Sequence, residues 1–121
     1  MDENLRKRNE TLAKTVIKGL KSRNMSGYYA ADKEEAVKLA LELIPEGSTI
    51  SMGGCASAQE VGLIKALEAG NYNYIDRAKL SPRESLMAAY DSDIFLSSAN
   101  AITSDGIMVN IDGNSNRVSC I

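Results

Sequence analysis

The sequence has no histidine, no tryptophan, a single phenylalanine and only two cysteines, Cys55 and Cys120. Without histidine or a nearby second thiol, a zinc site of ordinary composition and a cysteine nucleophile activated by histidine are both excluded. The charged N-terminal residues 1–8 do not resemble a secretory signal. Two cysteines in such a chain indicate free thiols in a reducing cytosol. We therefore predict a cytoplasmic protein with no metal site.

Long apolar runs and a surplus of basic residues are also missing. The longest apolar stretches are far too short to cross a bilayer. The formal net charge is -2 and the pI is about 5.2, so there is no excess of positive charge to attract a phosphate backbone. The 121 residues, 44% hydrophobic and 25% charged, suit one globular domain. The sequence therefore predicts one domain over residues 1–121, with no membrane and no nucleic acid among its partners.

Helix signals are present at four places. Leucines and a valine at helical spacing predict an amphipathic N-terminal helix over about residues 2–23. The other three helices are predicted from capping boxes, in which a side-chain oxygen accepts from first-turn amides and an acid follows three residues later. These boxes are Asp32 with Glu35, Ser57 with Glu60, and Ser81 with Glu84, the last with Pro82 at the first helical position. Pro45 and Gly70 are expected to end the first two of these helices.

Strand signals alternate with these helices, at residues 28–30, 48–52, 72–75 and 93–97. The alternation is typical of an α/β fold with a mostly parallel open sheet flanked by helices, and 49–52 and 94–97 are predicted to be interior strands. Near the C-terminus, Asp105-Gly106 and Asp112-Gly113 bound residues 107–111 and 117–121, which predicts an antiparallel ribbon. Residue 121 would then lie within a fresh strand. We therefore expect a C-terminally incomplete domain and, from its unpaired strand, a homo-oligomer.

The first candidate ligand site is the loop Ser-Met-Gly-Gly-Cys-Ala-Ser at residues 51–57. Gly53 and Gly54 let backbone amides approach a ligand, and the start of the helix at Ser57 offers unpaired N–H groups and partial positive charge. A phosphate, a carboxylate or the pyrophosphate of coenzyme A would suit such a site. The alternative is a tight turn and a helix cap without a ligand, because neither the dinucleotide spacing nor the P-loop spacing is present, and no cofactor is predicted. In the same loop, Cys55 is a nucleophile at a helix N-terminus or, as we favour, a small packed thiol.

The second candidate site lies in residues 97–106 and 109–117, which are rich in Asn, Asp and Gly and contain one arginine. Two hairpin turns account for much of this composition. Asn110, Asp112 and Asn114 resemble part of a calcium loop, but no glutamate follows at the distance that such a loop requires, so calcium is not expected. Turns leave Asn100 and Arg117 unexplained, and Arg117 can bind a carboxylate or phosphate through two N–H groups. The predicted ligand-binding residues are Gly53, Gly54, Ser57, Asn100, Asp105, Asn110, Asp112 and Arg117.

These two segments are expected to face one cleft. Both follow parallel strands, and loops after parallel strands emerge at the same edge of a sheet. Arg117 would complete a site for an anion, and Arg117→Ala is expected to weaken anion binding without unfolding the domain. A general base is harder to find: Glu60 is assigned to a cap, and Asp91 and Asp93 flank a turn where solvation is expected. Catalytic residues are therefore left open.

Several of these segments together resemble the lactate-utilization (LUD) domain family, and most closely a subgroup from anaerobic bacteria. The resemblance extends over about residues 5–121. It is carried by Gly53-Gly54 with the following Ser-Ala-Gln-Glu, by residues 93–102 (Asp-Ile-Phe-Leu-Ser-Ser-Ala-Asn-Ala-Ile), by Ser104-Asp-Gly, and by residues 109–117 (Val-Asn-Ile-Asp-Gly-Asn-Ser-Asn-Arg). The last two segments and the Asn-Ala-Ile sequence are the specific part of the match.

The resemblance implies a fold related to the superfamily of sugar-phosphate isomerases, CoA transferases and 5-formyltetrahydrofolate cyclo-ligases, in which ligands bind at loops after the strands. LUD-domain relatives are encoded with iron–sulfur proteins for L-lactate oxidation. Two functions from different classes follow as expectations. One is the binding of a small anionic metabolite in lactate utilization, and the other is a non-catalytic partnership with an iron–sulfur electron-transfer assembly. The family's later segments, including a cysteine-rich stretch, are not in this sequence, which counts against an iron–sulfur centre in the chain itself.

Overall fold

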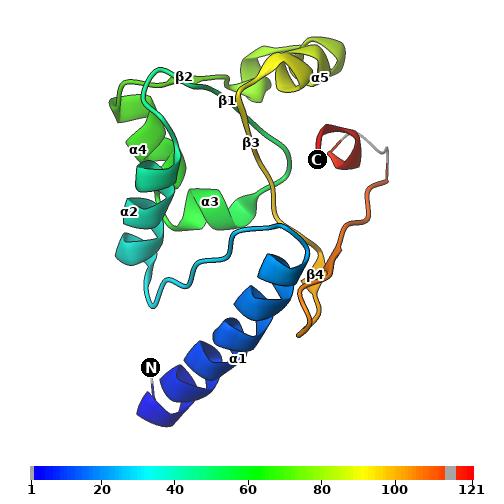
Figure 1. Cartoon of the computed structure of the whole chain (residues 1–121). Coiled ribbons are helices and arrows are strands. Elements are labelled where there is room, and N and C mark those ends of the chain that lie inside the picture. Colours follow the sequence, from blue (N-terminus) through cyan, green and yellow to red (C-terminus); the bar gives the residue numbers. More distant parts are fainter. Residues whose placement is uncertain (1, 114–116) are drawn as a thin grey trace.

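The computed structural model describes residues 2–113 and 117–121. The helices are α1 (Glu3–Ser22), α2 (Lys33–Leu43), α3 (Ala56–Glu60), α4 (Leu63–Ala69) and α5 (Pro82–Asp91), with 3-10 turns η1 (Arg77–Lys79) and η2 (Val118–Cys120). The strands are β1 (Thr49–Met52), β2 (Asn73–Tyr74), β3 (Ile94–Leu96), β4 (Ala101–Ile102) and β5 (Met108–Val109). Figure 1 shows an α/β body from which α1 projects.

Two of the predicted capping boxes begin helices in the structure. The Asp32 carboxylate accepts from the Glu35 amide at 2.8 Å, and the Glu35 carboxylate accepts in return from the amide of Ala31, one residue earlier than a standard box. The Ser81 hydroxyl accepts from the Glu84 amide at 3.2 Å at the start of α5. The predicted N-terminal helix is confirmed as α1.

The capping box predicted at Ser57 is wrong. Helix α3 already begins at Ala56, so Ser57 lies inside its first turn, and no described side chain caps the helix. The single helix expected from Ser57 to Gly70 is instead divided into α3 and α4 at Gly62, whose φ of 87° is left-handed and interrupts the helical hydrogen bonding. Gly70 ends α4 as predicted.

The described sheet is parallel, with strand order β2-β1-β3. Because the chain moves from β1 to β2 in one direction and then back past β1 to β3, right-handed crossovers place α3 and α4 on one face and α5 on the other. Figure 1 shows this separation, with α2 beside α4. The core lies between β1 and the α2–α4 side, where Ile50 and Leu67 are fully buried.

Two strand predictions are wrong. Strand β3 was expected in the interior but lies at an edge of the described sheet, because the chain after Leu96 continues into the β4–β5 hairpin and β1 is the only described strand that pairs with β3. Residues 28–30 form an extended connection between α1 and α2 with no strand pairing in the described structure, and the Tyr28 side chain is exposed. Strand β1 is interior, as predicted.

The antiparallel ribbon is confirmed, although its strands differ from the predicted pair. Strand β4 pairs with β5 across the Asp105-Gly106 turn, where Gly106 has a φ of 87°. Residues 117–121 were expected to form the second strand, but they contain η2, and the partner of β5 is β4. Asn114, which was considered for a calcium loop, lies outside the described residues.

Helix α1 is held to the body mainly near its C-terminal end. A Cβ atom at Gly19 would lie 2.1 Å from the Asp105 carbonyl oxygen, so only glycine permits this approach to the hairpin turn. Arg23 and Asp105 form an exposed ion pair at 3.4 Å beside it. None of the residues of α1 is buried. In the described part of the chain, no helix combines the length and the apolar character that a membrane span requires.

Candidate functional site

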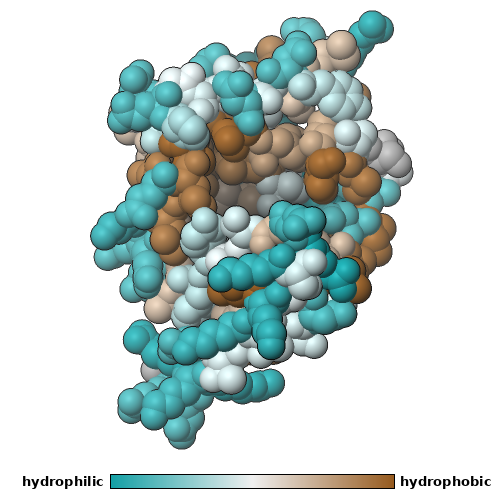
Figure 2. Space-filling model, viewed as in Figure 1, coloured by the Kyte–Doolittle hydropathy of each residue, from teal (hydrophilic) through white to brown (hydrophobic). Residues whose placement is uncertain are grey.

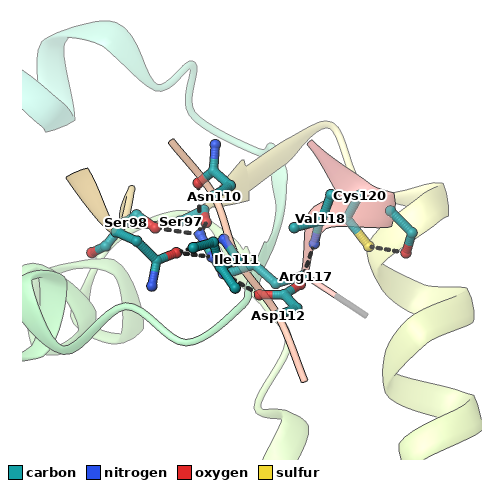
Figure 3. A network of polar contacts seen from close by, with 10 residues as sticks. Ser97, Ser98, Asn110, Ile111, Asp112, Arg117, Val118 and Cys120 are labelled. Carbon is teal, nitrogen blue, oxygen red and sulfur yellow. Dashed lines mark hydrogen bonds and ion pairs between the residues drawn. The ribbon is translucent and has the colours of Figure 1, made fainter. Parts of the chain in front are cut away.

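Arg117 is the centre of a polar cluster that lies beyond the carboxyl ends of β1 and β3. Its side chain is 9% exposed, and Asp112, which accepts from its Nε at 3.0 Å, is 8% exposed. The guanidinium also donates to the oxygens of four other groups: the Ser97 hydroxyl at 3.1 Å, the Asn110 amide at 2.9 Å, the Asn100 amide at 2.7 Å, and the Ser98 carbonyl. Figure 3 shows Arg117 surrounded by these partners.

Two of these acceptors also accept hydrogen bonds from backbone amides. The second carboxylate oxygen of Asp112 accepts from the Val118 amide at 2.6 Å, and the Asn100 side chain accepts from the Ile111 amide at 2.8 Å. The cluster therefore ties together the exit of β3, the exit of β5 and the start of η2. A buried ion pair is favourable only when its remaining hydrogen-bonding groups are satisfied. That condition holds here, because no buried side-chain nitrogen or oxygen in the described residues lacks a partner.

Gly53 is required by the packing of Arg117. A Cβ atom at Gly53 would lie 2.7 Å from Cγ of Arg117 and 2.9 Å from Cζ of Phe95, both closer than real Cβ contacts. The Gly53 amide donates to the Leu96 carbonyl at 2.9 Å, which continues the pairing of β1 with β3. The absent side chain lets the aliphatic part of Arg117 lie directly on the exit of β1.

The predicted site residues thus divide into two groups. Gly53 and the polar residues Asn100, Asn110, Asp112 and Arg117 come together around the guanidinium. Gly54, Ser57 and Asp105 lie elsewhere: Gly54 and Ser57 are exposed before and within α3, and Asp105 is in the hairpin turn. There a hydrogen bond from the Thr103 hydroxyl, more than the charge of Arg23, lowers the pKa of Asp105.

A cavity of about 780 Å³ opens next to this cluster. Its walls come from the carboxyl ends of the three parallel strands, from one face of α5 and from η2. Figure 2 shows the hollow, with hydrophobic residues on its walls. The apolar lining consists of Met52, Gly53, Ala78, Leu80, Pro82, Leu86, Ala89, Phe95 and Cys120, and the polar lining of Gln59, Tyr74, Asp76, Arg77, Arg83, Ser85 and Arg117.

Two arginines of this cavity, Arg77 and Arg83, were not among the predicted site residues. Both are exposed, and neither guanidinium has a hydrogen bond or carboxylate partner within the described structure. Arg77 follows β2, so it lies at the same edge of the sheet as the loops that follow β1 and β3. That position is the sequence signal that could have identified it, because ligands of open α/β sheets bind beyond the carboxyl ends of the strands.

Tyr74 and the two cysteines complete the site. Burial, and then the nearby charges of Asp76 and Glu68, raise the pKa of Tyr74, so its phenol is a hydrogen-bond donor at neutral pH. Cys55 is buried with its Sγ 3.1 Å from the Ser98 hydroxyl, and Cys120 lines the cavity; within the described residues neither cysteine forms a disulfide. Over residues 2–113 and 117–121, no three His, Cys, Asp or Glu side chains are grouped as metal ligands would be.

A comparison with protein families identifies the family of this chain. The family model of the LUD domain matches residues 13–121. The chain belongs to the LUD-domain family. This family is linked to lactate utilization. Neither the search of curated proteins nor that of solved structures gives a match for this LUD domain. Its expected relation to the sugar-phosphate isomerase and CoA transferase superfamily stays a prediction.

Proposed function

We propose that this LUD domain binds a small organic anion in the cavity beside α5, with Arg77 and Arg83 as its charge partners. One observation carries the proposal: two guanidinium groups that have no partner among the described residues line a cavity at the carboxyl ends of parallel strands. Guanidinium groups bind carboxylates through paired N–H donors. Because the family is linked to lactate utilization, a 2-hydroxycarboxylate is the first ligand to test.

Arg117 has a different role in this proposal from the one its sequence position suggests. Its donors are directed at five protein groups, so it has little capacity left for a ligand. It holds the loops after β3 and β5 in place, and its Cγ and Cδ atoms lie next to Gly53 at the cavity wall. The anion is therefore assigned to the arginines that follow β2 and begin α5, and Tyr74 can donate to its second polar group.

The proposal is tested by calorimetric titration of the protein with L-lactate. Arg77→Gln and Arg83→Gln should each weaken binding about tenfold or more, because a hydrogen bond to a charged group contributes about 1.5–3 kcal/mol. Arg8→Gln on the exposed part of α1 is the matched control, since it removes the same charge far from the cavity. Equal affinity in all three variants would contradict the assignment of the anion to this cavity.

A second function, a non-catalytic partnership with an iron–sulfur assembly, is favoured by the ribbon β4–β5. Its exposed apolar side chains include Ile102, Ile107, Met108 and Ile111, the last 70% exposed. Such a group of side chains on a small surface is typical of protein contacts. Adding the chain to a purified iron–sulfur assembly for lactate oxidation should raise its lactate-dependent electron-transfer rate, and Ile111→Ser should reduce the effect. An unchanged rate would contradict this function.

A further inference from the structure

The size and lining of the cavity point to a larger ligand than a three-carbon acid. A volume of about 780 Å³ is in the range of sites that hold drug-sized molecules, of roughly 300–1,000 Å³. We infer that the ligand is an amphipathic carboxylate, in which an apolar chain of several carbons extends from the acid group. This inference rests on the proposed function and specifies the class of anion that the same cavity takes.

The order of residues along α5 indicates how a bound ligand would be oriented. Arg83 lies in the first turn, and Leu86 and Ala89 follow at intervals of three residues. Side chains three or four residues apart share one face of a helix, and six residues correspond to about 9 Å along its axis. The cationic end of the cavity is therefore separated from an apolar region that runs along the same helix. A carboxylate at Arg83 would direct its chain toward Ala89.

The opposite walls continue this apolar region. Phe95 of β3 and Met52 of β1 line the cavity from the sheet, and Cys120 lines it from η2. Phe95 and Leu86 are only partly buried, so a bound chain would remove further apolar surface from water. Burial of apolar surface is favourable by about 25 cal/mol per Å². A purely polar ligand would leave this contribution unused, whereas an alkyl or aromatic chain would gain it.

The two arginines distinguish a small amphipathic acid from an apolar peptide as the occupant. An apolar segment of protein would cover Phe95 and Leu86 but would make no charged hydrogen bond with Arg77 or Arg83. A single carboxylate on an apolar chain would pair with the arginines through its charge and cover the apolar lining with its chain. The ligand class is therefore defined by the combination of charge and chain, and each part can be varied independently in an experiment.

The experiment is a calorimetric series with lactate, 2-hydroxybutanoate, 2-hydroxyhexanoate and 2-hydroxyoctanoate. Affinity should rise about fourfold for each added methylene group, the value that corresponds to burial of a methylene at about 0.8 kcal/mol. The amide of 2-hydroxyhexanoate, which keeps the chain and lacks the charge, should bind at least tenfold more weakly than the acid. Amide and acid of equal affinity would indicate an apolar occupant and overturn the inference.

A substitution on α5 tests the position of the chain. Ala89→Phe should fill the apolar end, so that the gain in affinity from lactate to 2-hydroxyoctanoate is lost. Met87→Phe is the control, because Met87 is on the same helix, is 53% exposed and does not line the cavity. If Ala89→Phe does not fold, the series with the unaltered protein decides alone. Lactate binding with no dependence on chain length overturns the inference and leaves the proposed function intact, whereas no binding by any acid overturns both.

Discussion

Replacing Arg117 by alanine would remove a buried guanidinium together with its contacts to five protein groups. The carboxylate of Asp112, 8% exposed, would then remain buried without its ion-pair partner. Breaking a buried pair from one side costs about 3–5 kcal/mol. The total stability of a domain is about 5–15 kcal/mol, so the expected loss is a large part of it. This expectation differs from the one drawn from the sequence, in which Arg117 bound the ligand and its loss left folding intact.

The measurement is the free energy of unfolding from urea denaturation followed by circular dichroism. Arg117→Ala is compared with Arg23→Ala, which breaks the exposed pair with Asp105 and should cost at most about 1 kcal/mol. Replacing Arg117 by Met and Asp112 by Leu together should restore part of the stability, because no unpaired charge is then buried. A loss for Arg117→Ala no larger than that for Arg23→Ala would refute the structural role of Arg117.

Three further predictions concern stability and association. Ser81→Ala should lower the free energy of unfolding by about 1 kcal/mol, because it removes the cap of α5. Ser57→Ala should leave the stability unchanged, because Ser57 caps no described helix. Equal effects of the two substitutions would contradict the assigned caps. Gly53→Ala should lower the free energy of unfolding by about 1–3 kcal/mol in the same urea assay, since its methyl group would overlap the fixed side chain of Arg117. Gly54→Ala should lower it by less than about 0.5 kcal/mol, because a Cβ atom there would meet no described atom within 4 Å. We propose that the chain forms a homo-oligomer through its exposed apolar side chains, so its sedimentation coefficient should rise with concentration; a monomer at every concentration would contradict this proposal.

Features that depend on neighbouring residues were the ones that could be predicted from the sequence. The caps at Asp32 and Ser81 join atoms three residues apart, so the sequence contains both partners. The capping box predicted at Ser57 was wrong, because the start of α3 depends on how the chain leaves β1 and not on residues three positions apart. The turn at Asp105-Gly106 was likewise predictable, since its left-handed glycine is a local requirement.

Strand pairing depended on partners that the sequence pattern does not identify. Residues 28–30 and 117–121 have apolar and aromatic residues suited to strands, yet neither segment pairs with a strand in the described structure; the first is an extended connection and the second contains η2. A segment becomes a strand only where another strand offers it free N–H and C=O groups. The edge position of β3 has the same origin.

The candidate site shows this division most clearly. The sequence by itself determined the α/β alternation, the LUD-domain membership and the presence of Gly53 and Arg117 in the candidate site. Only the tertiary structure decided that the donors of Arg117 point at five protein groups and that Arg77 and Arg83 line the cavity with no such partner in the part of the chain that the structure describes. The physical reason is that the availability of a charge depends on which acceptors surround it. The acceptors of Arg117 lie 5 to 20 residues away along the chain, and they meet around the guanidinium only when the sheet and the ribbon have formed.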